Sequence, residues 1–96
     1  MLIRSQNKEV LATLELLFDI EVSGGVISAR RDMSWCCLLG EYSTKAKAIK
    51  VLDMIQEAYS EYQIMLNFSV SYLHEFKEKT DGFDIFQMPE DSEVEA

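Results

Sequence analysis

Residues 39–62, LGEYSTKAKAIKVLDMIQEAYSEY, decide the fold that this sequence predicts. A short apolar run ends at Gly40, and Ser43 or Thr44 then supplies a side-chain oxygen suited to capping a helix. Apolar or aromatic residues follow in steps of three and four, which places them on one helical face. They are Ala48, Leu52, Ile55, Tyr59, Tyr62 and Leu66, with Val51 and Ala58 widening the stripe. We predict a long amphipathic helix whose apolar face covers one side of a sheet.

The sheet is expected in the first forty residues. Residues 2–39 are short apolar or alternating runs that turn residues separate, which is typical of an antiparallel β-meander. The clearest turn is Ser-Gly-Gly at 23–25, because glycine reaches positive φ angles at little steric cost. We therefore expect residues 17–22 and 26–30 to pair antiparallel.

Two periodicities compete beyond Tyr62. Residues 64–72 alternate with a period of two, as a strand does, yet apolar residues at helical spacing also continue the stripe. One helix from Thr44 to about Lys79 would be roughly 50 Å long, and a second chain would be needed to cover its far end. We favour a helix, either continuous or broken near residue 67, and the continuous form predicts a homodimer.

The expected fold class is α+β. An antiparallel β-meander of four to five strands packs against one long C-terminal helix, and a short final strand, FDIFQM at 83–88, ends before Pro89. Ninety-six residues have room for one modest core. We expect residues 1–89 to form a single α+β domain and residues 90–96 to form an acidic mobile tail.

The net charge of −8 comes from the second half of the chain, which is −9, whereas the first half is +1. Residues 1–50 contain seven Lys or Arg and six Asp or Glu, whereas residues 51–96 contain two and eleven. Such a surface repels phosphates, which argues against direct nucleic-acid binding and favours a partner protein with a basic surface. No apolar run approaches the roughly 20 residues of a membrane span, so we expect no membrane association and a cytoplasmic location.

No catalytic, cofactor or metal motif is present: the sequence lacks a glycine-rich phosphate loop, a Cys-x-x-Cys pair and a His-Glu-x-x-His helix. We expect no enzyme, no cofactor and no metal. Cys36 and Cys37 are neighbours, so we predict two free thiols on opposite faces of a strand, and their role is open. His74 is expected to be an exposed helical residue.

Two sets of residues are candidate contacts. Aromatic side chains are common at protein interfaces, which makes Trp35, Tyr59 and Tyr62, together with Glu57 and Glu61, a candidate protein-binding surface. Packing between sheet and helix is the other fate of such aromatics. The alternative function is a small-ligand-binding dimer with its site at the subunit seam, where Arg30, Arg31 and Trp35 would contact the ligand.

Three stretches resemble a group of small uncharacterised proteins that phages and prophages of Firmicutes encode. They are IRSQ at 3–6, LGEYSTKAKAIKVLDMIQEAY at 39–59 and FQMPEDSEVEA at 86–96. The resemblance implies a mobile-element origin and gives no residue a catalytic role. It implies a non-enzymatic module that binds a host protein through an acidic surface, for example as an inhibitor of a nucleic-acid-binding or defence protein.

Overall fold

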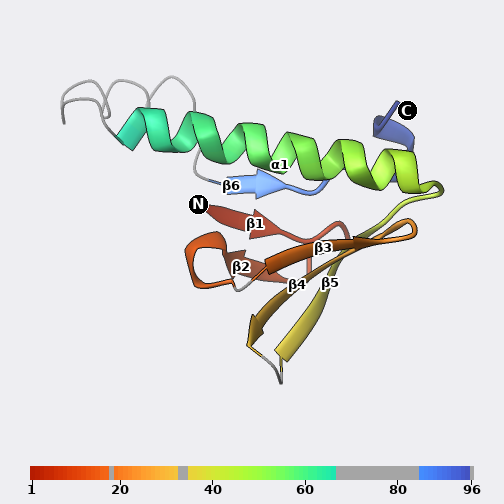
Figure 1. Ribbon diagram of the computed structural model, residues 1–96, viewed down its shortest axis with the longest axis horizontal. Coiled ribbons are helices and arrows are strands. Elements are labelled where there is room, and N and C mark those ends of the chain that lie inside the picture. Colours follow the sequence, from red (N-terminus) through yellow and green to blue (C-terminus); the bar gives the residue numbers. More distant parts are fainter. Residues whose placement is uncertain (18, 33–34, 67–84, 96) are drawn as a thin grey trace.

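Two three-stranded sheets and one long helix make up the described part of the chain (Figure 1). The computed structural model describes residues 1–17, 19–32, 35–66 and 85–95. The elements in chain order are β1 (Leu2–Arg4), β2 (Leu11–Thr13), the 3-10 helix η1 (Leu14–Leu16), β3 (Asp19–Ser23), β4 (Val26–Asp32), β5 (Trp35–Glu41), α1 (Lys45–Leu66), β6 (Ile85–Gln87) and the 3-10 helix η2 (Asp91–Glu93).

The first sheet joins segments from both ends of the chain. Its central strand, β1, is antiparallel to β2 and parallel to β6, so Ile3 lies between Ala12 and Phe86. Alternation along the strands buries Ile3 and Ala12, whereas Arg4 and Leu11 are exposed. Since β6 follows α1 in the chain, this sheet is completed only by a contact between residues more than eighty positions apart.

The second sheet is the antiparallel meander β3, β4 and β5. Its first turn confirms the predicted hairpin, and Gly24 there has a φ of 60°. Gly25 is required for a different reason: a Cβ at this position would collide with the main-chain oxygen of Tyr42. The Tyr42 N–H donates to the Gly25 carbonyl (2.7 Å), so the hairpin turn lies directly against the segment that enters α1.

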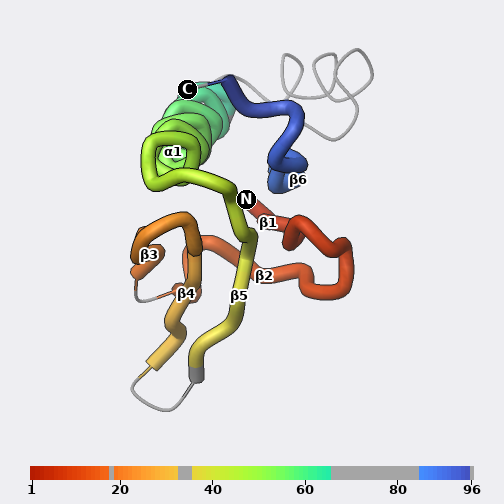
Figure 2. Tube along the Cα trace, turned by 90° about the vertical axis from the view of Figure 1, so that its right-hand side faces the viewer, coloured from red at the N-terminus to blue at the C-terminus, as the bar shows by residue number. Residues whose placement is uncertain are grey.

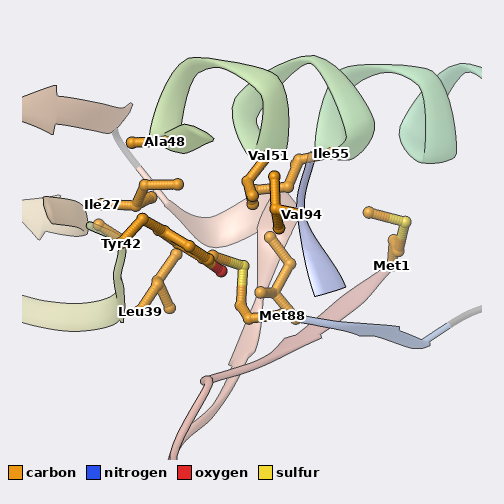
Figure 3. Packing of buried hydrophobic residues seen from close by; sticks show 11 residues of the cluster. Met1, Ile27, Leu39, Tyr42, Ala48, Val51, Ile55, Met88 and Val94 are labelled. Atoms are coloured by element: carbon orange, nitrogen blue, oxygen red, sulfur yellow. The ribbon is translucent and has the colours of Figure 1, made fainter. Parts of the chain in front are cut away.

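The helix packs on a core to which both sheets contribute, as the end-on view in Figure 2 and the close-up in Figure 3 show. Ala48, Val51 and Ile55 of α1 are buried, and from Ala48 to Tyr62 the predicted stripe is correct except that Val51 replaces half-buried Leu52 at its centre. The other buried members are Met1, Ile3, Ile27, Ala29, Leu39, Tyr42, Met88 and Val94. Thr44 caps α1, since its Oγ1 accepts the N–H of Lys47 at 3.1 Å.

The strand arrangement differs from the predicted single meander of four to five strands. In the part of the chain that the structure describes, six strands form two separate sheets, and of these β3 to β5 constitute a meander. Residues 14–16, expected to be extended, form the 3-10 helix η1. Alternating apolar residues identify strands but carry no information on their partners, which explains the difference. The helix is described to Leu66, and the predicted continuation to residue 79, with or without a break near 67, lies outside the described residues.

The C-terminal segment is packed against the domain, which differs from the acidic mobile tail that its composition predicts. Val94 is only 4% exposed and belongs to the core cluster. Glu90 and Glu93 form a reciprocal capping box around η2, so each side chain accepts a main-chain N–H of the other residue. One valine anchors a segment that is otherwise almost entirely polar.

Gln6 connects the two sheets and the C-terminal segment through hydrogen bonds. Its N–H donates to the Leu39 carbonyl (2.7 Å), and its Oε1 accepts the N–H of Glu41 (2.9 Å). Its Nε2 donates to the carbonyls of Glu41 (3.1 Å) and Pro89 (3.2 Å). The Tyr42 hydroxyl donates to the same Pro89 carbonyl at 2.8 Å. The chain that leaves β1 therefore covers the edge of β5 at the C-terminal end of that strand, where it leads into α1.

Two isoleucines on α1 test this arrangement. Ile55 is 4% exposed and Ile49 is 43% exposed. Ile55→Ala should reduce the free energy of unfolding by about 2–5 kcal/mol, because it leaves a cavity in the core. The matched variant Ile49→Ala should change it by no more than about 0.5 kcal/mol. Urea denaturation measures both values, and equal losses would mean that the helix is rotated from the orientation described.

Candidate functional site

Three carboxylates form a ridge on the exposed side of α1. Asp53, Glu57 and Glu61 follow one another at intervals of four residues, and all three are exposed. No cation in the described ranges lies within ion-pair distance of them. Like charges at this spacing repel each other by about 0.2–0.5 kcal/mol per pair. This acidic ridge therefore carries a small internal cost that a cationic partner would remove.

Lys47 and Lys50, near the start of α1, are engaged by the chain's own acidic segment. Positive charge at a helix N-terminus is unfavourable because it opposes the macrodipole. Lys47 Nζ donates to the Asp91 carbonyl (3.1 Å) and lies 3.5 Å from its carboxylate, and Lys50 Nζ donates to the Glu95 carbonyl. Figure 1 shows this segment beside the first turns of the helix. Cations thus face η2, and the acidic ridge lies further along α1.

Asp91 is the residue that ties this segment to the helix start. Its Oδ1 accepts the N–H of Ser43 at 2.7 Å. This hydrogen bond, helped by the charge of Lys47, lowers the pKa of Asp91. The neighbouring Tyr42 phenol has its pKa raised to about 12 by burial and by nearby carboxylates, so it remains a hydrogen-bond donor to Pro89 at neutral pH.

The predicted interface residues lie in three different places. Glu57 and Glu61 are on the solvent side of α1. Tyr59 and Tyr62 are half-buried against the core, with ring centroids 6.2 Å apart. Trp35 begins β5 at the end of the β4–β5 hairpin that projects away from α1 (Figures 1 and 2), and its side chain is not described. The structure joins the two glutamates to Asp53 and separates them from the aromatic residues.

The two adjacent arginines have different surroundings. Arg30 Nη2 lies 2.9 Å from Asp19 Oδ2 and 2.6 Å from Glu21 Oε1, across the β3–β4 pair. The hydrogen bond and charge of Asp19, followed by the charge of Glu21, raise the pKa of Arg30. Arg31 falls at an irregularity in the β4–β5 pairing and lines a separate hollow. The two side chains therefore do not form one ligand-binding fork.

Shallow hollows lined by described residues include one beside β2 and one beside β5. One, of about 210 Å³, lies beside β2 and is lined by Leu11, Ala12, Thr13, Leu16, Leu17 and Arg31. The other, of about 160 Å³, is lined by Gln6, Asn7, Leu38, Leu39, Gly40 and Glu41. Sites for drug-sized ligands usually have about 300–1,000 Å³. These volumes suit a single side chain better than a cofactor.

The thiols lie on opposite faces of β5, as the alternation predicts: Cys36 is exposed and Cys37 is half-buried. Burial, and to a smaller extent the neighbouring Cys36, raises the pKa of Cys37, which disfavours the nucleophilic thiolate. The described residues contain no cluster of three or more potential metal ligands. None of the described helices has the length and apolar character needed to cross a bilayer.

Sequence reasoning located Glu57 and Glu61 of the acidic ridge but not Asp53, and it missed Gln6 and Asp91. Both residues act through contacts between segments distant in the chain, 35 positions apart for Gln6 and Glu41 and 48 for Ser43 and Asp91. Only the apolar Val94 within the acidic run hinted that the C-terminal segment packs. No family model, no curated protein sequence and no solved structure matches this chain.

The contact between Asp91 and Ser43 predicts a pH-dependent contribution to stability. The folded pKa of Asp91 is below its ordinary value of 3.8, so the contribution is complete above that pH and is lost as pH falls through the folded pKa. Asp91→Asn should lower the melting temperature by a constant amount between about pH 5 and 8, and the difference from wild type should shrink below about pH 4. Differential scanning calorimetry measures both melting temperatures.

Asp53→Asn is the matched control, because Asp53 is exposed on α1 and has no hydrogen-bond partner among the described residues. Its melting temperature should stay close to that of the wild type at neutral pH. A difference between wild type and Asp91→Asn that is absent at pH 7, or that grows on acidification, would contradict the assigned contact.

Proposed function

We propose that this protein is a non-enzymatic protein-binding module of phage or prophage origin that acts in the cytoplasm. Its acidic ridge docks on the basic surface of a host or phage protein. One observation supports this proposal above the others: Asp53, Glu57 and Glu61 line one exposed side of α1 without ion pairs among the described residues, while Lys47 and Lys50 face the C-terminal segment.

The mechanism is occlusion. The ridge presents three charges over two turns of a helix that the core holds in place, so little conformational entropy is lost on docking. Complementary charge accelerates encounter and selects partners. A protein that normally binds nucleic acid has a clustered cationic surface, which the ridge would cover. The partner class we favour is therefore a nucleic-acid-binding or defence protein of the host.

The geometry favours this proposal over a small-ligand-binding dimer. Arg30 is already paired with Asp19 and Glu21. Arg31 lines a hollow of about 210 Å³, which is smaller than a usual ligand site. For both arginines to bind one ligand, Arg30 would have to break its ion pairs with Asp19 and Glu21 on the neighbouring strand.

Removing the charge of the ridge tests the proposed function. The immobilised wild-type protein should capture a partner from bacterial lysate that elutes at moderate salt and is displaced by duplex DNA. The triple variant Asp53→Asn, Glu57→Gln, Glu61→Gln should bind the purified partner about tenfold more weakly, because each exposed charge pair contributes about 0.2–1 kcal/mol. Titration calorimetry at several salt concentrations measures the dissociation constant. The variant's salt dependence should also be flatter.

The control variant loses the same charge elsewhere. Glu9→Gln, Glu41→Gln and Glu95→Gln change three exposed carboxylates that do not belong to α1. This control should retain wild-type affinity to within about twofold, and both triple variants should melt at or above the wild-type temperature, since like-charge repulsion is reduced. Equal weakening by both sets would assign the effect to net charge, and unchanged binding in both would exclude the ridge.

A further inference from the structure

Along its outer edge, β2 has main-chain groups for which the described residues provide no hydrogen-bond partner. Across the β1–β2 pair, the Ser5 N–H donates to the Val10 carbonyl and the Leu14 N–H donates to the Met1 carbonyl. Residues 10, 12 and 14 of this segment therefore form its hydrogen bonds with β1. By alternation, the N–H and C=O groups of Leu11 and Thr13 point away from β1. The described part of the chain places no strand on that edge. Two donors and two acceptors are thus presented in the register that a further strand needs.

Exposed apolar side chains lie beside this edge. Leu11 is 56% exposed and Leu16 is 68% exposed, although both are large aliphatic residues on a small domain. Together with Ala12 and Leu17 they line the hollow of about 210 Å³. That volume accommodates one leucine- or phenylalanine-sized side chain. An extended chain added to β2 would direct every second side chain to this face, so one of them can fill the hollow.

Arg31 determines the charge that this hollow prefers. Its side chain lines the rim and is 58% exposed, and its Nε lies 3.8 Å from the carboxylate of Asp32. A solvent-exposed pair at that distance contributes little energy. A guanidinium beside aliphatic side chains recognises a carboxylate next to an apolar residue.

We propose that the outer edge of β2 and the adjoining hollow, formed by Leu11, Thr13, Leu16 and Arg31, bind an extended segment of a partner protein by strand addition. The segment pairs its main chain with Leu11 and Thr13, inserts one leucine or phenylalanine side chain into the hollow and places an acidic residue against Arg31. This surface is separate from the acidic ridge and does not depend on that ridge being functional.

Two synthetic peptides test the proposal. One is the N-acetylated, C-amidated peptide Thr-Val-Leu-Val-Asp-Thr, in which Leu and Asp are two residues apart and share a face of the strand, and the other has Lys in place of Asp. In ¹⁵N-edited NMR titrations of the full chain, the Asp peptide should shift the amide signals of Leu11 and Thr13 most strongly and protect both from hydrogen exchange. The Lys peptide should bind at least about fivefold more weakly, because a charge-assisted hydrogen bond is lost.

Three variants and one control decide the outcome. Arg31→Glu should reverse the order of the two peptides. Thr13→Pro removes an outward N–H, and the φ of −88° at this position is close to the angle that proline adopts. Leu16→Gln makes the hollow more polar. Each variant should reduce the affinity for the Asp peptide about tenfold. The control Leu38→Gln alters a leucine that is 49% exposed on β5 and should leave peptide affinity unchanged. If Thr13→Pro does not fold, the reversal by Arg31→Glu still decides.

Several results would overturn the proposal. They are equal affinity for the two peptides, amide shifts centred away from β2, and no shift at millimolar peptide. Protection of the Leu11 and Thr13 amides without peptide, accompanied by a dimer mass in light scattering, would also overturn it, because a second copy of this chain would then occupy the edge.

Discussion

Burial of one face of α1 is the interaction on which the rest of the structure depends. Each sheet has three strands among the described residues, which is near the smallest number that is stable when one face is covered. The helix covers the sheets through Ala48, Val51 and Ile55. These side chains pack with residues from both sheets and from the C-terminal segment. Because this face is buried, the opposite side of the helix faces solvent. The position of Asp53, Glu57 and Glu61 is therefore a consequence of the core.

A polar junction complements the apolar core. Gln6 contacts Glu41 and Pro89, and Tyr42 contacts Pro89, so the chain after β1, the end of β5 and the segment after β6 meet in one place. Gly40 lies in the same region, where a Cβ would approach the Tyr42 ring to 3.0 Å. Residues 3–6, 39–59 and 86–96 contribute these side chains and main-chain groups. Their contacts here are architectural.

The sequence predicts local structure well and long-range pairing poorly. The stripe on α1, the cap at Thr44 and the hairpin at Gly24 follow from spacing and backbone preference over a few residues. The parallel pair of β1 with β6 does not, since any short alternating strand satisfies the same pattern. The composition of the C-terminal segment did not predict its packing, because its acidic residues outnumber the one buried valine, Val94.

The candidate site was predicted in part for the same reason. Helical spacing alone puts Glu57 and Glu61 on one side, and it also puts Asp53 there. Spacing does not reveal that Tyr59 and Tyr62 face the core, or that Arg30 is committed to Asp19 and Glu21. The edge of β2 is a property of sheet order, which requires three-dimensional information.

Methyl NOE spectroscopy tests the central claim, which is that α1 buries the Val51 side of the helix. The structure predicts cross-peaks from the Val51 and Ile55 methyl groups to Met88, Val94 and Ile27, because these side chains belong to one cluster (Figure 3). Ile49 should show none of them. Cross-peaks from Ile49 to Met88 and Val94, with none from Val51, would contradict the account and would turn the acidic ridge toward the core.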